Sequence, residues 1–129
     1  MRMKIAIIAL AANVVCGVAG ARAQSAPLYP VTDCSQLKVQ MELNRCAGAN
    51  YEASDTALNA LYRKLMMTKE VDAASKERLR EAERAWIAYR DKECAYEVGS
   101  QRDGGSIWPM EMSNCLEELT AARIRGLSK

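Results

Sequence analysis

The segment Leu79–Cys94 constrains the fold most, because it has the pattern of a long amphipathic helix that ends at a cysteine. It contains neither glycine nor proline. At 100° per residue, its apolar stripe consists of Leu79, Ala82, Trp86 and Tyr89. The two aromatic side chains are therefore expected in the core, and the terminal cysteine is expected to fix the end of the helix covalently. The flanking segments are then expected to form helices that cover Trp86.

The first 23 residues are predicted to be a secretory signal peptide rather than part of the fold. Arg2 and Lys4 give a basic start, residues 5–20 are almost wholly apolar, and Ala21–Ala23 has the small-x-small pattern that precedes cleavage. An uncleaved N-terminal anchor is the alternative, and a lipoprotein that uses Cys16 fits poorly. We therefore expect a periplasmic or secreted protein, with no stable membrane insertion after cleavage.

Removing this leader changes the charge of the chain. The leader holds three of the 18 basic residues and none of the 16 acidic ones, so the mature chain has a net charge near −1. A strongly basic net charge would indicate a nucleic-acid or membrane partner, and the mature chain does not have such a charge. No nucleic-acid partner is expected.

Four cysteines remain after the leader, and an even number in a short exported chain indicates two disulfides. Three pairings are open. The favoured pairing is Cys34 with Cys46 and Cys94 with Cys115, because both links are short-range. The crossed pairings would tie the first helix to the others and remain open on sequence grounds.

The remaining segments predict one helical domain over residues 24–129. Residues 24–33 form a flexible lead-in, and Thr32, Asp33 and Ser35 are candidate caps for a first helix that continues to Leu65. Gly48 is expected to kink this helix or split it.

Two polar interruptions separate the later helices. A short turn is expected over Thr68–Ala74, with Asp72 or Ser75 starting the second helix, and an irregular loop is expected over Gly99–Ser106. A final helix is predicted over Glu111–Leu127. The predicted fold class is all-α, a small three- to four-helix antiparallel bundle with two disulfides.

Asp55 and Arg90 are expected to form an internal pair between the first two helices. Each lies close to the apolar side of its helix, and a bidentate bond would satisfy both charges. If the pair is fully buried, removing either partner would cost about 3–5 kcal/mol.

Catalytic and metal-binding chemistry is poorly represented. The chain has no histidine, which removes the commonest general base and the commonest metal ligand. The four cysteines lack a close Cys-x-x-Cys pair, and exposed helical faces account for the acidic residues. We therefore expect no catalytic residue, no metal site, no cofactor and no enzymatic activity.

The block Trp86-x-x-Tyr89-Arg90-Asp91-x-x-Cys94 is the most specific motif of the chain. It stands in order with Cys46, Asp55, Leu58, Asn59, Tyr62, Leu79, Arg80, Ala82, Arg84, Gly105, Ser106, Cys115, Leu116, Thr120 and Arg123. This set of residues resembles the lysozyme-inhibitor LprI-like family of small exported bacterial proteins. Glu83 departs from the glutamine that the family usually carries. The resemblance implies a helical, disulfide-linked domain, and its named activity is lysozyme inhibition. Asp55, Leu58, Tyr62, Trp86, Tyr89 and Arg90 are interpreted as its structural motif.

Function is then expected on the surface, through a protein partner that is a lysozyme or another envelope protein. The loop Gly99–Ser106 is the candidate contact, because loops held by rigid scaffolds often carry function. Its available groups are Gln101, Arg102, Asp103 and Ser106. A solvated connector is the competing interpretation of this loop. The alternatives for the whole protein are an immunity-type or scaffold protein and an envelope stress protein.

Overall fold

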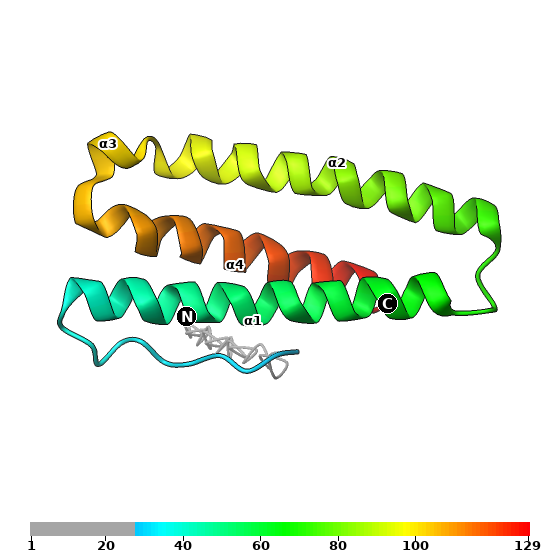
Figure 1. Cartoon of the computed structure of the whole chain (residues 1–129), viewed down its shortest axis with the longest axis horizontal. Helices are drawn as coiled ribbons and strands as arrows, with labels where there is room; N and C mark the ends of the chain where they lie inside the picture. The colour runs from blue at the N-terminus through cyan, green and yellow to red at the C-terminus, as the bar shows by residue number, and fades with distance from the viewer. Residues whose placement is uncertain (1–27) are drawn as a thin grey trace, which may run out of the picture.

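A computed structural model describes residues 28–129, so the predicted signal peptide lies outside the described residues. The elements are α1 (Gln40–Met67), α2 (Ala73–Val98), α3 (Gln101–Gly104), the 3-10 turn η1 (Gly105–Ile107) and α4 (Trp108–Leu127). Residues 28–129 contain no strand, which confirms the all-α prediction (Figure 1). Within the same residues, none of the helices combines the length and the apolar character that a bilayer crossing requires.

The bundle is built around α4. This helix packs most extensively on α1 and less extensively on α2, whereas α1 and α2 make little direct contact with each other. In Figure 1, α4 runs between the two long helices and ends before it reaches the turn that joins them. As a result, the facing surfaces of α1 and α2 are only partly covered by α4.

The two disulfides join the cysteines that the sequence favoured as partners. Cys34 is bonded to Cys46, and Cys94 is bonded to Cys115. The first link holds the segment before α1 against that helix, and the second joins α2 to α4. Cys94 is fully buried, so the second link lies inside the bundle.

The first helix begins later than the candidate caps indicated. It starts at Gln40 after Val39, without a side-chain cap, and the carboxylate of Asp33 instead accepts a hydrogen bond from the backbone N–H of Ser35 in a preceding turn. The side chain of Asn50 binds both the backbone N–H and the carbonyl of Thr32, which holds this segment beside α1. The backbone N–H and carbonyl of Thr32 therefore bond to α1, and they are not free to form the first turn of a helix.

The expected break at Gly48 is absent, since α1 is one continuous helix of 28 residues. Gly48 is partly buried, and a Cβ atom at this position would meet no neighbouring atom within 4 Å. The intrinsic cost of one glycine in a helix is about 1 kcal/mol, which the packing of α1 on α4 offsets.

Asp72 caps the second helix, as one of the two sequence interpretations predicted. Its carboxylate accepts hydrogen bonds from the backbone N–H and the hydroxyl of Ser75. These bonds hold the pKa of Asp72 below its ordinary value. The cap therefore stabilises the fold above the carboxyl group's ordinary pKa, and its contribution is lost as pH falls through the lowered value.

Asp72→Ala is expected to lower the melting temperature at neutral pH, because the first N–H groups of α2 lose their acceptor. Asp72→Ser should retain most of the stability, since a serine hydroxyl can also accept these bonds. Thermal unfolding followed by circular dichroism measures both variants. Equal melting temperatures for the alanine variant and the parent would contradict the capping role.

The segment Gly99–Ser106 is not an irregular loop, because two short helical pieces occupy it. Gly99 and Gly105 have φ values of 74° and 57°, which only glycine adopts readily, and they bracket α3. Ser100 caps α3 by accepting a hydrogen bond from the N–H of Asp103. The final helix begins at Trp108, earlier than predicted.

The buried face of α2 is rotated relative to the predicted apolar stripe. Glu83, Arg90 and Cys94 are buried, whereas Tyr89 is 52 % exposed and Trp86 is only partly buried. The expectation that Tyr89 belongs to the core was therefore wrong. The link from Cys94 to α4 fixes the rotation, and ion pairs make the burial of Glu83 and Arg90 tolerable.

Candidate functional site

Trp86 lies among charged side chains where the three long helices approach one another. The guanidinium carbon of Arg90 is 5.2 Å from the centre of the Trp86 ring and 5.6 Å from that of Tyr51. The guanidinium carbon of Arg123, from α4, is 5.8 Å from the Trp86 ring. Cation–π attraction of this kind orients the indole and both arginines together.

Arg123 also forms an ion pair with Glu83 that sequence reasoning missed. The Nε and Nη2 atoms of Arg123 donate to one carboxylate oxygen of Glu83, at 3.0 and 2.8 Å. Both side chains are largely shielded from solvent, with 22 % and 10 % of their surfaces exposed. Two features of the sequence could have predicted this pair: a glutamate at position 83 where the resembling family usually carries glutamine, and the presence of Arg123 among the residues that match that family.

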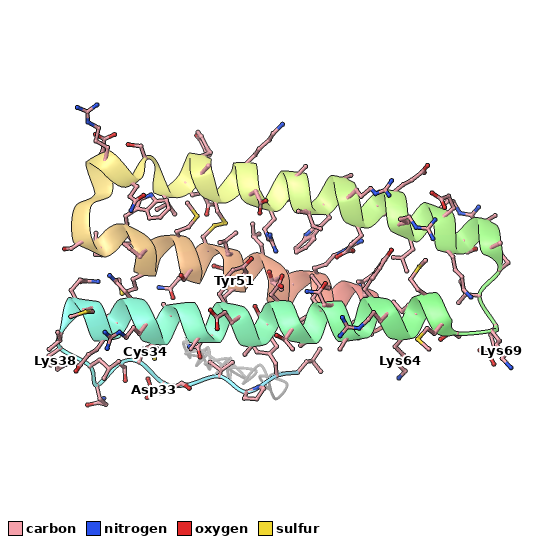
Figure 2. The ribbon with its side chains drawn as sticks, in the orientation of Figure 1. Asp33, Cys34, Lys38, Tyr51, Lys64 and Lys69 are labelled. Carbon is pink, nitrogen blue, oxygen red and sulfur yellow. A yellow bond between two sulfur atoms is a disulfide. The ribbon has the colours of Figure 1, made fainter. Side chains whose placement is uncertain are left out.

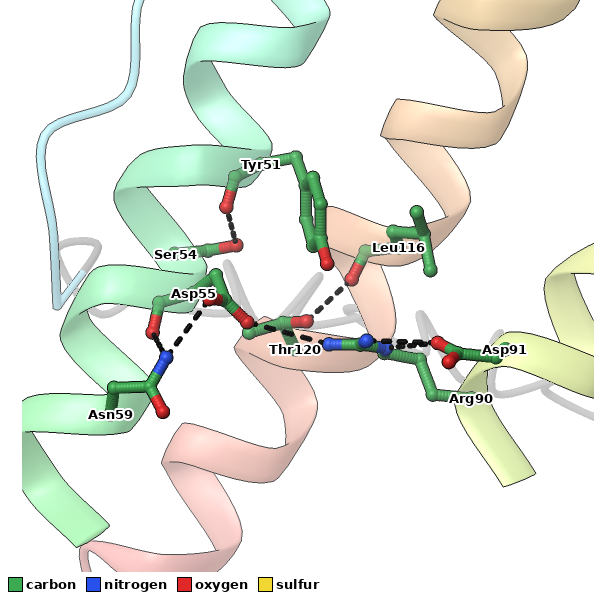
Figure 3. Close-up of polar contacts among 8 residues, drawn as sticks. All are labelled: Tyr51, Ser54, Asp55, Asn59, Arg90, Asp91, Leu116 and Thr120. Atoms are coloured by element: carbon green, nitrogen blue, oxygen red, sulfur yellow. Dashed lines mark hydrogen bonds and ion pairs between the residues drawn. The ribbon is translucent and has the colours of Figure 1, made fainter. Parts of the chain in front are cut away.

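The predicted contact between Asp55 and Arg90 exists, but it is not bidentate. The Nη1 atom of Arg90 is 3.5 Å from Asp55, whereas its Nε and Nη2 atoms donate to the adjacent Asp91 at 2.9 and 2.8 Å (Figure 3). Asp55 also accepts a hydrogen bond from the side chain of Asn59. Its side chain is 41 % exposed, so this carboxylate lies at the edge of the helix interface.

Asp55→Asn is therefore expected to cost no more than about 1 kcal/mol of unfolding free energy, well below the value for a fully buried pair. The reason is that water screens Asp55 and that Asp91 still neutralises Arg90. Urea unfolding of the variant and the parent measures the difference. A loss of about 3 kcal/mol or more would show that the pair behaves as a buried one.

Small polar residues allow α1 and α4 to pack closely beside this network. Ser54 and Thr120 are fully buried, and their hydroxyls donate to the carbonyls of Tyr51 and Leu116, each at 2.7 Å (Figure 3). Each hydroxyl is thus satisfied within its own helix. Burial also raises the pKa of the Tyr51 hydroxyl above its ordinary value, although the neighbouring Arg90 partly opposes this change.

A groove of about 480 Å³ lies between α1 and α2. It brings together five of the six residues of the predicted structural motif, and Tyr89 is the one outside it. The lining residues are Asp55, Leu58, Asn59, Tyr62, Arg80, Glu83, Arg84, Trp86, Ile87 and Arg90. A volume of this size is in the range of ligand sites in proteins.

The second candidate site is the corner formed by α3 and η1, residues 99–107, which replaces the predicted loop at one end of the bundle (Figure 1). Gln101, Arg102, Asp103 and Ser106 are all exposed there. The described residues 28–129 provide no carboxylate partner for Arg102, whereas Asp103 accepts a hydrogen bond from the hydroxyl of Ser100.

Contacts on both sides hold this corner in place. The indole N–H of Trp108 donates to the carbonyl of Gly99 at 3.0 Å, and the side chain of Asn44 donates to the carbonyl of Ser106 at 3.0 Å. The disulfide Cys94–Cys115 joins α2 and α4 close to the corner. These contacts tie both ends of the corner to the helices that flank it.

Charge is divided unevenly along the bundle. Residues 61–84 and 121–129, near the α1–α2 turn, contain ten Lys or Arg against five Asp or Glu. The other described residues, 28–60 and 85–120, contain five against eleven. Lys64 and Lys69 lie at the basic end, and Asp33 lies toward the opposite one (Figure 2). The corner thus projects from the acidic part of the molecule, whereas the groove spans the border, with Tyr62, Arg80, Glu83 and Arg84 in the basic part.

No cluster of three or more potential metal ligands occurs among the residues whose positions the structure describes. The four cysteines that a zinc site would have used form the two disulfides.

Comparison with known proteins gives one relative and one family. The chain is 39 % identical over 125 residues to "Uncharacterized protein R02472" of Rhizobium meliloti (strain 1021), covering 88 % of this chain and 86 % of the relative. No solved structure matches significantly. The sequence model of the family described as "Lysozyme inhibitor LprI" matches residues 32–127. This range includes all three long helices, both disulfides, the groove and the corner, and the chain therefore belongs to the lysozyme inhibitor LprI family.

Proposed function

We propose that this protein is an exported binding protein that inhibits a lysozyme by inserting the α3–η1 corner into the enzyme's substrate cleft. Membership of an inhibitor family supports the activity. Two disulfides fit an oxidising compartment outside the cytoplasm, either the periplasm or the extracellular space. The partner is a protein, and inhibition requires no chemistry from this chain.

The observation that carries the proposal is the exposed Arg102 on a corner that is hydrogen-bonded at both of its ends. Glycoside hydrolases generally use two carboxyl groups that flank the scissile bond. A guanidinium is suited to such groups because it can donate to a carboxylate through two parallel bonds. With Asp103 engaged by Ser100, Arg102 is the free charged group at the tip among the described residues.

The anchoring of the corner favours tight binding. A loop that is already ordered loses less conformational entropy when it binds. Here, the bonds from Trp108 and Asn44 fix the two ends of the segment, and α3 and η1 hydrogen-bond its backbone internally. The flanking disulfide supplies a covalent link between the two helices that lead into it.

Hydrogen exchange of the protein alone and mixed with a lysozyme tests the location of the contact. We expect slower exchange over residues 99–107 in the mixture, and little change at the α1–α2 turn. Protection confined to another surface would contradict the corner as the binding element. If no segment exchanged more slowly at protein concentrations that saturate inhibition, this result would also contradict the corner as the binding element.

Arg102→Ala is expected to weaken binding to the lysozyme, and Arg102→Glu is expected to weaken it further, because the substituted carboxylate would face the enzyme's carboxylates. The loss for alanine should be about tenfold or more, the range of an interface hot spot. Calorimetric titration measures the Kd of each variant. Unchanged thermal unfolding would show that the fold is intact.

Arg63→Glu is the matched control, because it makes the same charge change at an exposed arginine on α1, away from the corner. This variant should bind like the parent. If Arg102→Glu and Arg63→Glu weaken binding equally, the effect comes from net charge, and the corner has no specific role.

A further inference from the structure

The groove between α1 and α2 has two chemically different walls. The α1 wall presents Asp55, Asn59 and Tyr62, which supply oxygen acceptors, an amide and a hydroxyl. The α2 wall presents Arg80, Arg84 and Arg90 with Trp86 and Ile87, and its one acid, Glu83, is paired with Arg123. Because α1 and α2 make little direct contact with each other, side chains from both helices line the space between these walls.

The cationic wall is incompletely neutralised. Arg80 and Arg84 are one helical turn apart, so their charges repel each other weakly. Arg80 is paired with Glu77, whereas Arg84 has no carboxylate partner within residues 28–129. The segment 61–84, which contains both arginines, holds seven Lys or Arg against five Asp or Glu. An anionic group in the groove beside Arg84 would relieve this repulsion and gain charge-assisted hydrogen bonds.

The acidic group lies at the other end of the groove. Asp55 is 41 % exposed, which leaves acceptor capacity beyond its bonds to Asn59 and Arg90. At 1.5 Å per residue, the seven positions from Asp55 to Tyr62 span roughly 10 Å, and the six from Arg84 to Arg90 span about 9 Å. An extended peptide of about three residues has this length.

We propose that the α1–α2 groove binds a short peptide through its free C-terminal carboxylate. Arg84, with Arg80 beside it, holds the carboxylate, and Asp55 accepts from the N–H groups at the other end of the peptide. Leu58 and Ile87 provide apolar contact for side chains between these ends. This site is separate from the corner, so it extends the proposed function and does not depend on it.

The tripeptide Ala-Ala-Ala is the probe, and its C-terminal amide is the matched comparison. The two indole N–H signals of the disulfide-bonded protein report binding by NMR. Trp86 lines the groove, whereas Trp108 is the first residue of α4, next to the corner, and donates to Gly99. We expect a saturable shift of the Trp86 signal alone, and binding about tenfold weaker for the amide, because the amide lacks the charge that the arginines recognise.

Arg84→Ala should weaken binding of the free-acid peptide about tenfold and should affect the amide little. Arg45→Ala is the control, because it removes an exposed arginine near the N-terminal end of α1, outside the groove. This variant should bind like the parent. Absence of a saturable shift, equal affinity for acid and amide, or equal losses in the Arg84 and Arg45 variants would each overturn the proposal. None of these outcomes bears on lysozyme inhibition.

Discussion

Arg123→Met is expected to lower the free energy of unfolding by about 3–5 kcal/mol, because it leaves the carboxylate of Glu83 buried without its partner. Glu83 is 8 % exposed and accepts two hydrogen bonds from Arg123. The same change removes one of the two guanidinium groups that flank Trp86. Urea unfolding followed by the helical circular dichroism signal measures the loss.

The double variant Glu83→Gln with Arg123→Met separates the lost ion pair from lost packing. Glutamine keeps the shape of the side chain and removes its charge, so the double variant should be more stable than Arg123→Met alone. A double-mutant cycle then gives the coupling energy of the two residues. If the double variant is less stable by the sum of the two single losses, Glu83 and Arg123 act independently and the pair does not hold α2 on α4.

Removing the buried disulfide by Cys94→Ala with Cys115→Ala is expected to cost about 3 kcal/mol, from the entropy that the unfolded chain regains when the closed loop is opened. The bond spans 21 positions and joins α2 to α4, which otherwise contact each other less than α1 and α4 do. The corner also loses the link across its base. Thermal and urea unfolding of the double variant measure the effect.

The companion variant, Cys34→Ala with Cys46→Ala, provides the comparison. That bond spans 12 positions and attaches the segment before α1 to the outside of the bundle. Its loss should cost less, and exchange protection at the corner should be unaffected. A larger loss for this pair than for Cys94 and Cys115 would show that the lead-in, and not the α2–α4 link, dominates the stability of the fold.

The sequence was sufficient to predict the helical fold class, the second helix and the favoured disulfide pairing. Asp72 followed by a long segment without glycine or proline indicates a helix start and an uninterrupted body, and α2 has both. Short cysteine spacings favoured local links, and the structure has them. Each of these features depends on residues that are near one another along the chain.

Features that depend on tertiary contacts were predicted less well. The apolar stripe of the second helix predicted that Tyr89 is buried and that Glu83 lies next to the buried face. Hydropathy alone cannot show that Arg123, which is distant along the chain, neutralises Glu83 and allows its burial. The glycines of residues 99–106 suggested an irregular loop, whereas Gly99 and Gly105 turn the backbone around a helical piece that Ser100 caps. The groove was not predicted, since its lining residues come from α1 and α2 and are far apart along the chain.

Lysozyme inhibition is measured as the rate at which a lysozyme clears a suspension of bacterial cell walls at increasing concentrations of the oxidised protein. We expect clearance to slow until the enzyme is saturated, with a midpoint that shifts to higher concentration for Arg102→Glu and is unchanged for Arg63→Glu. Clearance that continues at the same rate with excess protein, for every lysozyme tested, would contradict lysozyme inhibition. Another exported protein would then be the partner to identify.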